Sequence, residues 1–246
     1  MARLPRVVAP GLPHHVTQRG NRRQQTFFND GDYVEYLRLL SLSCRSFGTE
    51  VLAYCLMPNH VHLVLVPGDE FGLRDALAEA HHQYTRFVNF REGWRGHLWQ
   101  ERFHSFVMDE RHLLAAARYV ERNPVRARLC ATPQDWPWSS ARAHLACKDD
   151  SLVSVRPLLE LIPHWDAFVG QTDAADFGEL LHAHASTGRP LGPDSFVELL
   201  ERRLGRSLKR RKPGPKPRER DGETRDLFED RSVFHIGTFA PLQART

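Results

Sequence analysis

Two histidines separated by one residue, His60 and His62, form the clearest chemical pattern in the sequence. They begin an apolar run, ending at Val66, whose β-favouring residues predict a strand. Because side chains alternate across a strand, both imidazoles point to the same face and can hold one metal ion together. An isolated pair of this kind is more often two ordinary strand histidines, so the metal hypothesis needs support from elsewhere in the chain.

A tyrosine and an asparagine four residues apart, Tyr119 and Asn123, lie in a segment that predicts a helix. This spacing places both side chains on the same side of the helix. A tyrosine hydroxyl can act as a nucleophile, and an amide oxygen can bind a metal ion. The structural alternative is that Tyr119 seals the helix against a sheet and Asn123 ends the helix before Pro124. The apolar stripe lies to one side of the tyrosine, so we expect an uncovered phenol.

The elements that position these residues predict an α+β, ferredoxin-like catalytic domain with an antiparallel sheet. We expect Asp32 to cap the first helix and Pro124 to stop the third, and Pro58 with Asn59 to form a tight hairpin. This is the split β-α-β order, in which we expect helices on one sheet face and substrate on the other. The predicted strands are 14–19, 51–57, 60–66 and 103–108, and the predicted helices are 32–48, 73–90 and 111–122.

Two further segments follow the predicted catalytic domain, which we place at residues 1–147. Residues 148–208 show weak periodicity until 196–204, which predicts an amphipathic helix, so we expect a helical accessory region that contacts DNA. Residues 209–246 begin with a run of lysine, arginine, proline and glycine that cannot bury a core. We therefore expect this last segment to be a flexible basic tail.

The composition is that of a globular protein with a preference for a polyanionic partner. Hydrophobic residues make up 41% and charged residues 26% of the 246 residues, and the formal net charge is +4. A basic balance favours nucleic acid, although any single arginine can be a solvated surface residue. The arginines that we expect to neutralise DNA phosphates are Arg19, Arg22, Arg23, Arg118, Arg122 and Arg126.

Three tryptophans, Trp99, Trp136 and Trp138, are candidates for stacking on unpaired bases, with core packing as the alternative. The four cysteines contain no C-x-x-C pair, which favours reduced thiols. The first residues lack a signal-peptide pattern, and no run approaches the roughly 18 apolar residues of a membrane span. We expect a cytoplasmic protein without a membrane segment.

Four motifs follow one another along the chain. They are Met-Pro-Asn-His-Val-His-Leu at 57–63, Gly-His-Leu-Trp-Gln at 96–100, Arg-Tyr-Val-Glu-Arg-Asn-Pro-Val-Arg-Ala at 118–127 and Trp-Pro-Trp-Ser-Ser at 136–140. Taken together, they resemble the REP-associated branch of the single-tyrosine HUH transposases, which are IS200-like. The similarity runs in the same order from about residue 11 to about residue 217, which makes chance agreement improbable.

The resemblance implies an enzyme that cleaves and rejoins single-stranded DNA at hairpin or palindromic repeats. It implies that His60 and His62 hold Mg²⁺ or Mn²⁺, and that Tyr119 attacks phosphorus to form a 5′-phosphotyrosine and a free 3′-hydroxyl. Asn123 occupies the position of a third metal ligand in the family. Ligand preference alone would suit zinc or nickel equally well. Dimeric relatives exchange the tyrosine helix, so a monomer and a homodimer both stay open.

Two other functions fit parts of the same pattern. The first is a non-catalytic DNA- or RNA-binding regulator derived from such a transposase, against which the intact His60, His62, Tyr119 and Asn123 argue. The second is a metal hydrolase that activates water. The sequence has no H-E-x-x-H motif and no carboxylate close to the histidine pair, so this second function lacks a base.

Overall fold

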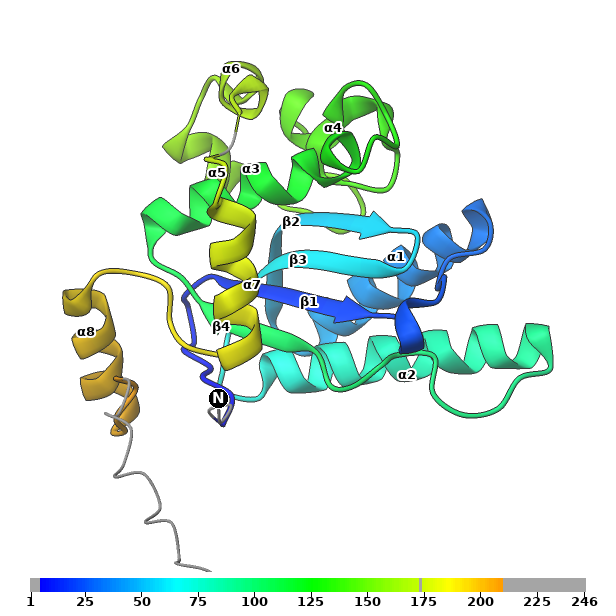
Figure 1. The fold of residues 1–246 in the computed structure, drawn as a ribbon, viewed down its shortest axis with the longest axis horizontal. Helices are drawn as coiled ribbons and strands as arrows, with labels where there is room; N and C mark the ends of the chain where they lie inside the picture. The colour runs from blue at the N-terminus through cyan, green and yellow to red at the C-terminus, as the bar shows by residue number, and fades with distance from the viewer. Residues whose placement is uncertain (1–4, 173, 210–246) are drawn as a thin grey trace, which may run out of the picture. The chain divides into compact units, whose positions relative to one another are not determined.

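Four strands form one antiparallel sheet in the order β2-β3-β1-β4 (Figure 1). The computed structural model describes residues 5–172 and 174–209, and the described residues up to Lys209 belong to one compact unit. The predicted α+β class is confirmed. Most of the predicted 209–246 tail lies outside the described residues. The strands are β1 (His14–Arg19), β2 (Thr49–Met57), β3 (His60–Pro67) and β4 (His104–Val107).

Three long helices accompany the sheet, and further helices follow them along the chain. The long helices are α1 (Asp30–Ser46), α2 (Gly72–Glu92) and α3 (Glu110–Arg126). The later helices are α4 (Ala141–Leu145), α5 (Arg156–Leu161), α6 (Trp165–Gly170), α7 (Phe177–Thr187) and α8 (Asp194–Leu204). The 3-10 turns are η1 (Asn21–Arg23) and η2 (Pro133–Asp135).

Helices cover both faces of the sheet, so the expectation of one open face is wrong. On the first face, Val16, Leu63 and Leu65 are buried in the core that α1 and α2 complete. On the second face, Val64 and Phe106 are buried against α3 and the later helices. The apolar side of α3 is buried against this second face. α7 also covers it, in contact with β1 and β4 (Figure 1).

Two predicted helix ends differ from the structure. Asn29, not Asp32, caps α1, since the Asn29 Oδ1 accepts a hydrogen bond from the Asp32 backbone N–H at 3.2 Å. The buried Asp32 carboxylate instead accepts the Phe28 N–H at 2.7 Å. Pro124 does not stop α3, which continues to Arg126. The Ala127 N–H donates to the Asn123 carbonyl at 2.9 Å and so closes the turn that contains the proline. The helix lacks only the one backbone hydrogen bond that Pro124 cannot donate.

The C-terminal region is helical, as expected, although only its last helix was predicted. The apolar side of α8 packs through Leu200 against Val7, Ala9 and Val107, near the start of the chain. The boundary at residue 147 stays a prediction. Within residues 5–209, leaving out residue 173, no helix has the length and apolar character that crossing a membrane needs.

The three tryptophans singled out from the sequence serve packing. Trp99 is buried, and its indole N–H donates to the His81 carbonyl. Trp138 stacks on Tyr33 with ring centroids 4.7 Å apart. Trp136 is partly buried and donates its indole N–H to the Leu56 carbonyl at 3.0 Å. These contacts leave core packing as the role of all three.

Buried histidines on the α1–α2 side should make folding stability fall in acid. Burial lowers the pKa of His14 to about 4 and that of His81 to about 3. Between pH 6.5 and those values the unfolded chain binds more protons than the folded one, so stability is lost as pH falls through this range. We expect the free energy of unfolding, measured with urea, to fall by up to about 1.4 kcal/mol per pH unit for each such histidine. His81→Leu should reduce the slope between pH 6.5 and 4.5, and the same change at exposed His82 should not.

Candidate active site

The strand register gathers polar side chains on the sheet face that α3 covers. Thr17 pairs with His62 on one side and His104 on the other, and Arg19 pairs with His60. Directly paired residues share a face, and residues two apart on a strand share it as well. His15 therefore lies on the same face as the two candidate metal-binding histidines. The predicted placement of His60 and His62 on one face is confirmed by this register.

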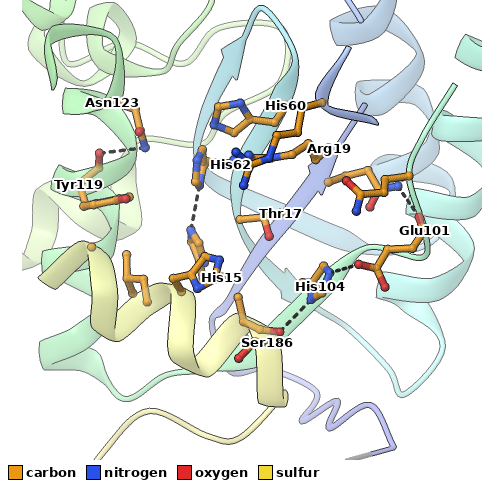
Figure 2. A pocket seen from close by; sticks show the side chains of 17 residues that line it. His15, Thr17, Arg19, His60, His62, Glu101, His104, Tyr119, Asn123 and Ser186 are labelled. Atoms are coloured by element: carbon orange, nitrogen blue, oxygen red, sulfur yellow. Dashed lines mark hydrogen bonds and ion pairs between the residues drawn. The ribbon is translucent and has the colours of Figure 1, made fainter. Parts of the chain in front are cut away.

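The tyrosine of α3 meets the histidine pair of β3 across this face (Figure 2). The ring centroids of His60 and His62 are 4.9 Å apart, and those of His62 and Tyr119 are 6.0 Å apart. Asn123 follows on the next turn of α3 and faces the same space (Figure 2). The structure thus brings together all four residues that the sequence singled out.

These four residues line one end of a cavity of about 520 Å³. Arg19 and Arg23 line it beside the histidine pair, and Glu101 and His104 line it on the β4 side. α7 contributes Gly178, Leu181, His182, Ala185 and Ser186. The volume exceeds that of a single phosphate group and is compatible with a bound nucleotide segment.

Tyr119 is covered rather than exposed, so that expectation is wrong. Its exposed fraction is 9%, because Phe177 of α7 packs edge-on against the ring with centroids 5.9 Å apart. Arg126 lies over the same ring, with Cζ 4.0 Å from the centroid. A Cβ atom on Gly178 would lie 3.3 Å from the tyrosine hydroxyl, which is tighter than normal packing. A glycine at this position lets α7 approach the tyrosine closely.

The hydrogen bonds of His60 define which ring nitrogen faces the cavity. Asn59 Oδ1 lies 2.6 Å from His60 Nδ1, and a carboxamide oxygen only accepts, so Nδ1 carries the proton and Nε2 keeps its lone pair. The Asn59 amide also donates to the Arg23 carbonyl at 2.9 Å. Burial, followed by the charge of Arg19, lowers the pKa of His60 to about 4. Burial therefore favours a neutral His60, while Asn59 fixes its tautomer and ties it to the η1 turn.

A third histidine, His15 of β1, lies beside His62. His62 Nδ1 lies 3.3 Å from His15 Nε2, and the His15 ring packs 5.2 Å from that of Phe106. His15 Nδ1 is buried and has no hydrogen-bond partner within the described residues. Burial lowers the pKa of His15 to about 4, and burial followed by His60 lowers that of His62 well below its usual value. His15 was not among the site residues predicted from the sequence, although its alternation with Thr17 and Arg19 on the first strand was a usable signal.

Asn123 faces the cavity, whereas only some of the predicted DNA-binding arginines lie at the cavity or against Tyr119. The Asn123 amide nitrogen donates to the Tyr119 backbone carbonyl at 3.3 Å, and its Oδ1 makes no hydrogen bond in the part of the chain described. Arg118 donates to Gln171 and Arg122 donates to the Val169 carbonyl, so both guanidinium groups face the α6 region. Arg22 does not line the cavity. Of the six arginines named from the sequence, Arg19, Arg23 and Arg126 thus have direct contact with the cavity or with Tyr119.

Comparison with known proteins gives this arrangement a family. Residues 10–123, which include β1 to β4, the histidine pair and Tyr119, match the family described as "Transposase IS200 like". This segment is therefore similar to the IS200-like transposases. The chain is also 28% identical over 121 residues to a Haemophilus influenzae protein named as a REP-associated tyrosine transposase. The match covers 44% of this chain and 69% of that relative.

A solved structure shares the fold of this chain. It is described as a REP-associated tyrosine transposase bound to a REP hairpin, and its similarity has a TM-score of 0.52 with 21% identity. The alignment covers 59% of this chain and 86% of that one. At this identity the likeness establishes the fold, and the hairpin is a ligand of that protein.

Proposed function

We propose that this transposase cleaves and rejoins single-stranded DNA at hairpin or palindromic repeats through a covalent bond to Tyr119. The observation that carries the proposal is the meeting of Tyr119 with His60 and His62 in a cavity that arginines flank. A tyrosine, two neutral imidazoles and guanidinium groups match the needs of phosphodiester transfer, which requires a nucleophile and stabilisation of phosphate charge.

His60, His62 and Asn123 would hold the divalent cation, Mg²⁺ or Mn²⁺, that this family uses. Within the described residues, no three His, Cys, Asp or Glu side chains converge as a metal site, so a third protein ligand has to be of another type. The Asn123 Oδ1, together with two neutral histidines, of which His60 has its tautomer fixed by Asn59, fits such a site. When bound, the cation would polarise the scissile phosphate and orient it toward the tyrosine.

The proposed reaction is a transesterification in which atoms and charge balance. The Tyr119 oxygen forms a bond to phosphorus and loses its proton, the bond from phosphorus to the 3′-oxygen breaks, and that oxygen leaves as a 3′-hydroxyl. The 5′-phosphate stays on the tyrosine, and attack by a 3′-hydroxyl reverses the step. Arg19 and Arg23 would hold the flanking phosphates, and Arg126 orients the tyrosine ring by lying over it.

A labelling experiment tests the proposal. The full chain is incubated with end-labelled hairpin DNA that carries single-stranded flanks, in Mg²⁺, in Mn²⁺ or in chelator, and is then denatured. We expect a covalent protein–DNA adduct that needs metal and that mass spectrometry maps to Tyr119. Binding without adduct or cleavage would instead support the non-catalytic regulator.

The contact between His15 and His62 gives a prediction for metal affinity. His15→Phe keeps an aromatic ring beside Phe106 but removes the nitrogen that faces His62. Loss of such an outer contact typically weakens metal binding by about 10- to 100-fold. We expect this loss in titrations followed by Mn²⁺ electron paramagnetic resonance. His82→Phe, at an exposed position on α2, is the control, and equal affinities for the two variants would contradict the assigned role.

A further inference from the structure

Four aromatic side chains near the C-terminal end of α2 are exposed to solvent. The residues, here called the terminal aromatic cluster, are Phe28, Phe87, Phe90 and Trp94, with exposed fractions of 37%, 36%, 93% and 45%. Phe28 and Trp94 pack edge to face with centroids 5.6 Å apart. Figure 1 shows this end of α2 projecting past the strands. Exposed aromatic residues gathered in one place commonly mark an interaction surface.

Arginines are interleaved with the terminal aromatic cluster. The Arg91 guanidinium lies 5.7 Å from the Phe28 ring and 5.5 Å from the Phe87 ring, and it is held by Asp32 and Glu92. Arg86 and Arg95 on the same stretch are exposed and form no ion pair within residues 5–209, residue 173 excepted. Flat rings beside unneutralised guanidinium groups fit a polyanion that also offers flat rings, which is an unpaired nucleic acid strand.

The chain segment that joins the cavity to the terminal aromatic cluster is short and is held by backbone hydrogen bonds. Arg23 lines the cavity, and Phe28 follows five residues later, so the two backbones are at most about 18 Å apart. The connecting residues Thr26 and Phe27 both donate backbone N–H groups to the Pro58 carbonyl, at the turn before His60. A strand that leaves the cavity over Arg23 therefore reaches the aromatic side chains within a few nucleotides.

We propose that the terminal aromatic cluster binds unpaired bases of the DNA strand outside the cavity by stacking, with Phe90 and Trp94 as the main platforms. The proposal rests on the proposed function only in taking single-stranded DNA as the substrate. It assigns base stacking to exposed surface rings in place of Trp99, Trp136 and Trp138, which pack within the fold.

The test measures how much an unpaired extension adds to DNA affinity. The Tyr119→Phe protein, which should bind without reacting, is titrated in chelator with a blunt hairpin and with hairpins that carry a 5′ or a 3′ unpaired extension. We expect an extension of one polarity to tighten binding by about 5- to 100-fold, as stacking on one or two rings would. Phe90→Ala combined with Trp94→Ala should remove this gain and leave blunt-hairpin affinity unchanged.

Two variants make the test specific. Phe90→Trp keeps a stacking surface and should retain the gain. Phe71→Ala is the matched control, because Phe71 is a 48% exposed phenylalanine beneath an arginine, Arg74, at the other end of the same helix. Quenching of tryptophan fluorescence by the extension should disappear in Trp94→Phe, since the other tryptophans are more deeply buried.

The outcomes separate this inference from the proposed function. If wild-type protein forms an adduct but extensions add no affinity, or the double variant keeps the gain, the stacking proposal is overturned alone. If no adduct forms yet the gain depends on Phe90 and Trp94, stacking stands and the catalytic proposal fails. Concentration-dependent dimerisation that Phe90→Ala abolishes, with DNA affinity unaltered, would show that the cluster is an interface between two copies and overturn the proposal.

Discussion

The Tyr119→Phe protein should bind hairpin DNA as tightly as wild type and form no covalent adduct, a loss of more than about 10³-fold in adduct yield. The substitution removes only the hydroxyl, which makes no hydrogen bond within the described residues. The ring contacts with Phe177 and Arg126 do not need that oxygen. Denaturing gels of labelled DNA, with fluorescence anisotropy for binding, measure the two quantities separately.

Tyr33→Phe is the matched control for this prediction. Tyr33 is a buried tyrosine whose ring packs between Phe27 and Trp138, away from the cavity residues. Its variant should retain adduct formation and thermal stability. Cleavage that persists in Tyr119→Phe would exclude the tyrosine as nucleophile and favour a hydrolase that uses bound water.

The proposed catalytic residues could be placed from the sequence because their spacing matches the period of the element that carries them. His60 and His62 share a face on any strand, and Tyr119 and Asn123 share a side on any helix. The hairpin between β2 and β3 was equally local, since Pro58 and Asn59 leave few other connections. What the sequence did not reveal was the pairing of β1 with β3, which adds His15 behind His62.

The cover over Tyr119 could not be read from the sequence because it depends on distant residues. α7 follows α3 by some fifty residues, and it packs on Tyr119 through Phe177 and through Gly178, a glycine that looks like a helix breaker in isolation. Pro124 misled for the opposite reason: its local preference to end a helix was overridden by burial of the last turn of α3. Arg118 and Arg122 were assigned to DNA because they flank Tyr119 in the sequence, whereas they donate hydrogen bonds to residues in and next to α6.

A buried carboxylate joins the tyrosine helix to the region after it. Glu121 is fully buried two residues after Tyr119, and its Oε1 accepts from the Ser140 hydroxyl at 2.7 Å and from His144 Nδ1 at 2.6 Å. Its Oε2 accepts the Trp165 indole N–H at 2.8 Å. Ser140 also accepts the Tyr54 backbone N–H of β2 at 3.1 Å. One side chain therefore links α3 to α4, α6 and the sheet.

Glu121→Gln should be the most destabilising conservative change on α3. The new amide offers one accepting oxygen where the carboxylate offers two, so Trp165 keeps its acceptor only if Ser140 and His144 both change from donating to accepting. Leaving a buried polar partner unmatched costs about 1 to 3 kcal/mol, and more when a charged group is involved, so we expect a loss of about 2 to 4 kcal/mol in unfolding free energy. Urea unfolding at constant pH measures this loss.

Glu110→Gln, on an exposed carboxylate in the first turn of the same helix, should change unfolding free energy by less than about 0.5 kcal/mol. Trp165→Phe removes one donor to Glu121 and should make Glu121→Gln less costly in the double variant, because the unmatched N–H is then gone. If the losses of unfolding free energy in the two single variants add up to the loss in the double variant, Glu121 and Trp165 are not coupled and the network is contradicted. Because the carboxylate anchors the helix without reaching the cavity, Glu121→Gln protein that is still folded at low temperature should form the adduct at nearly the wild-type rate.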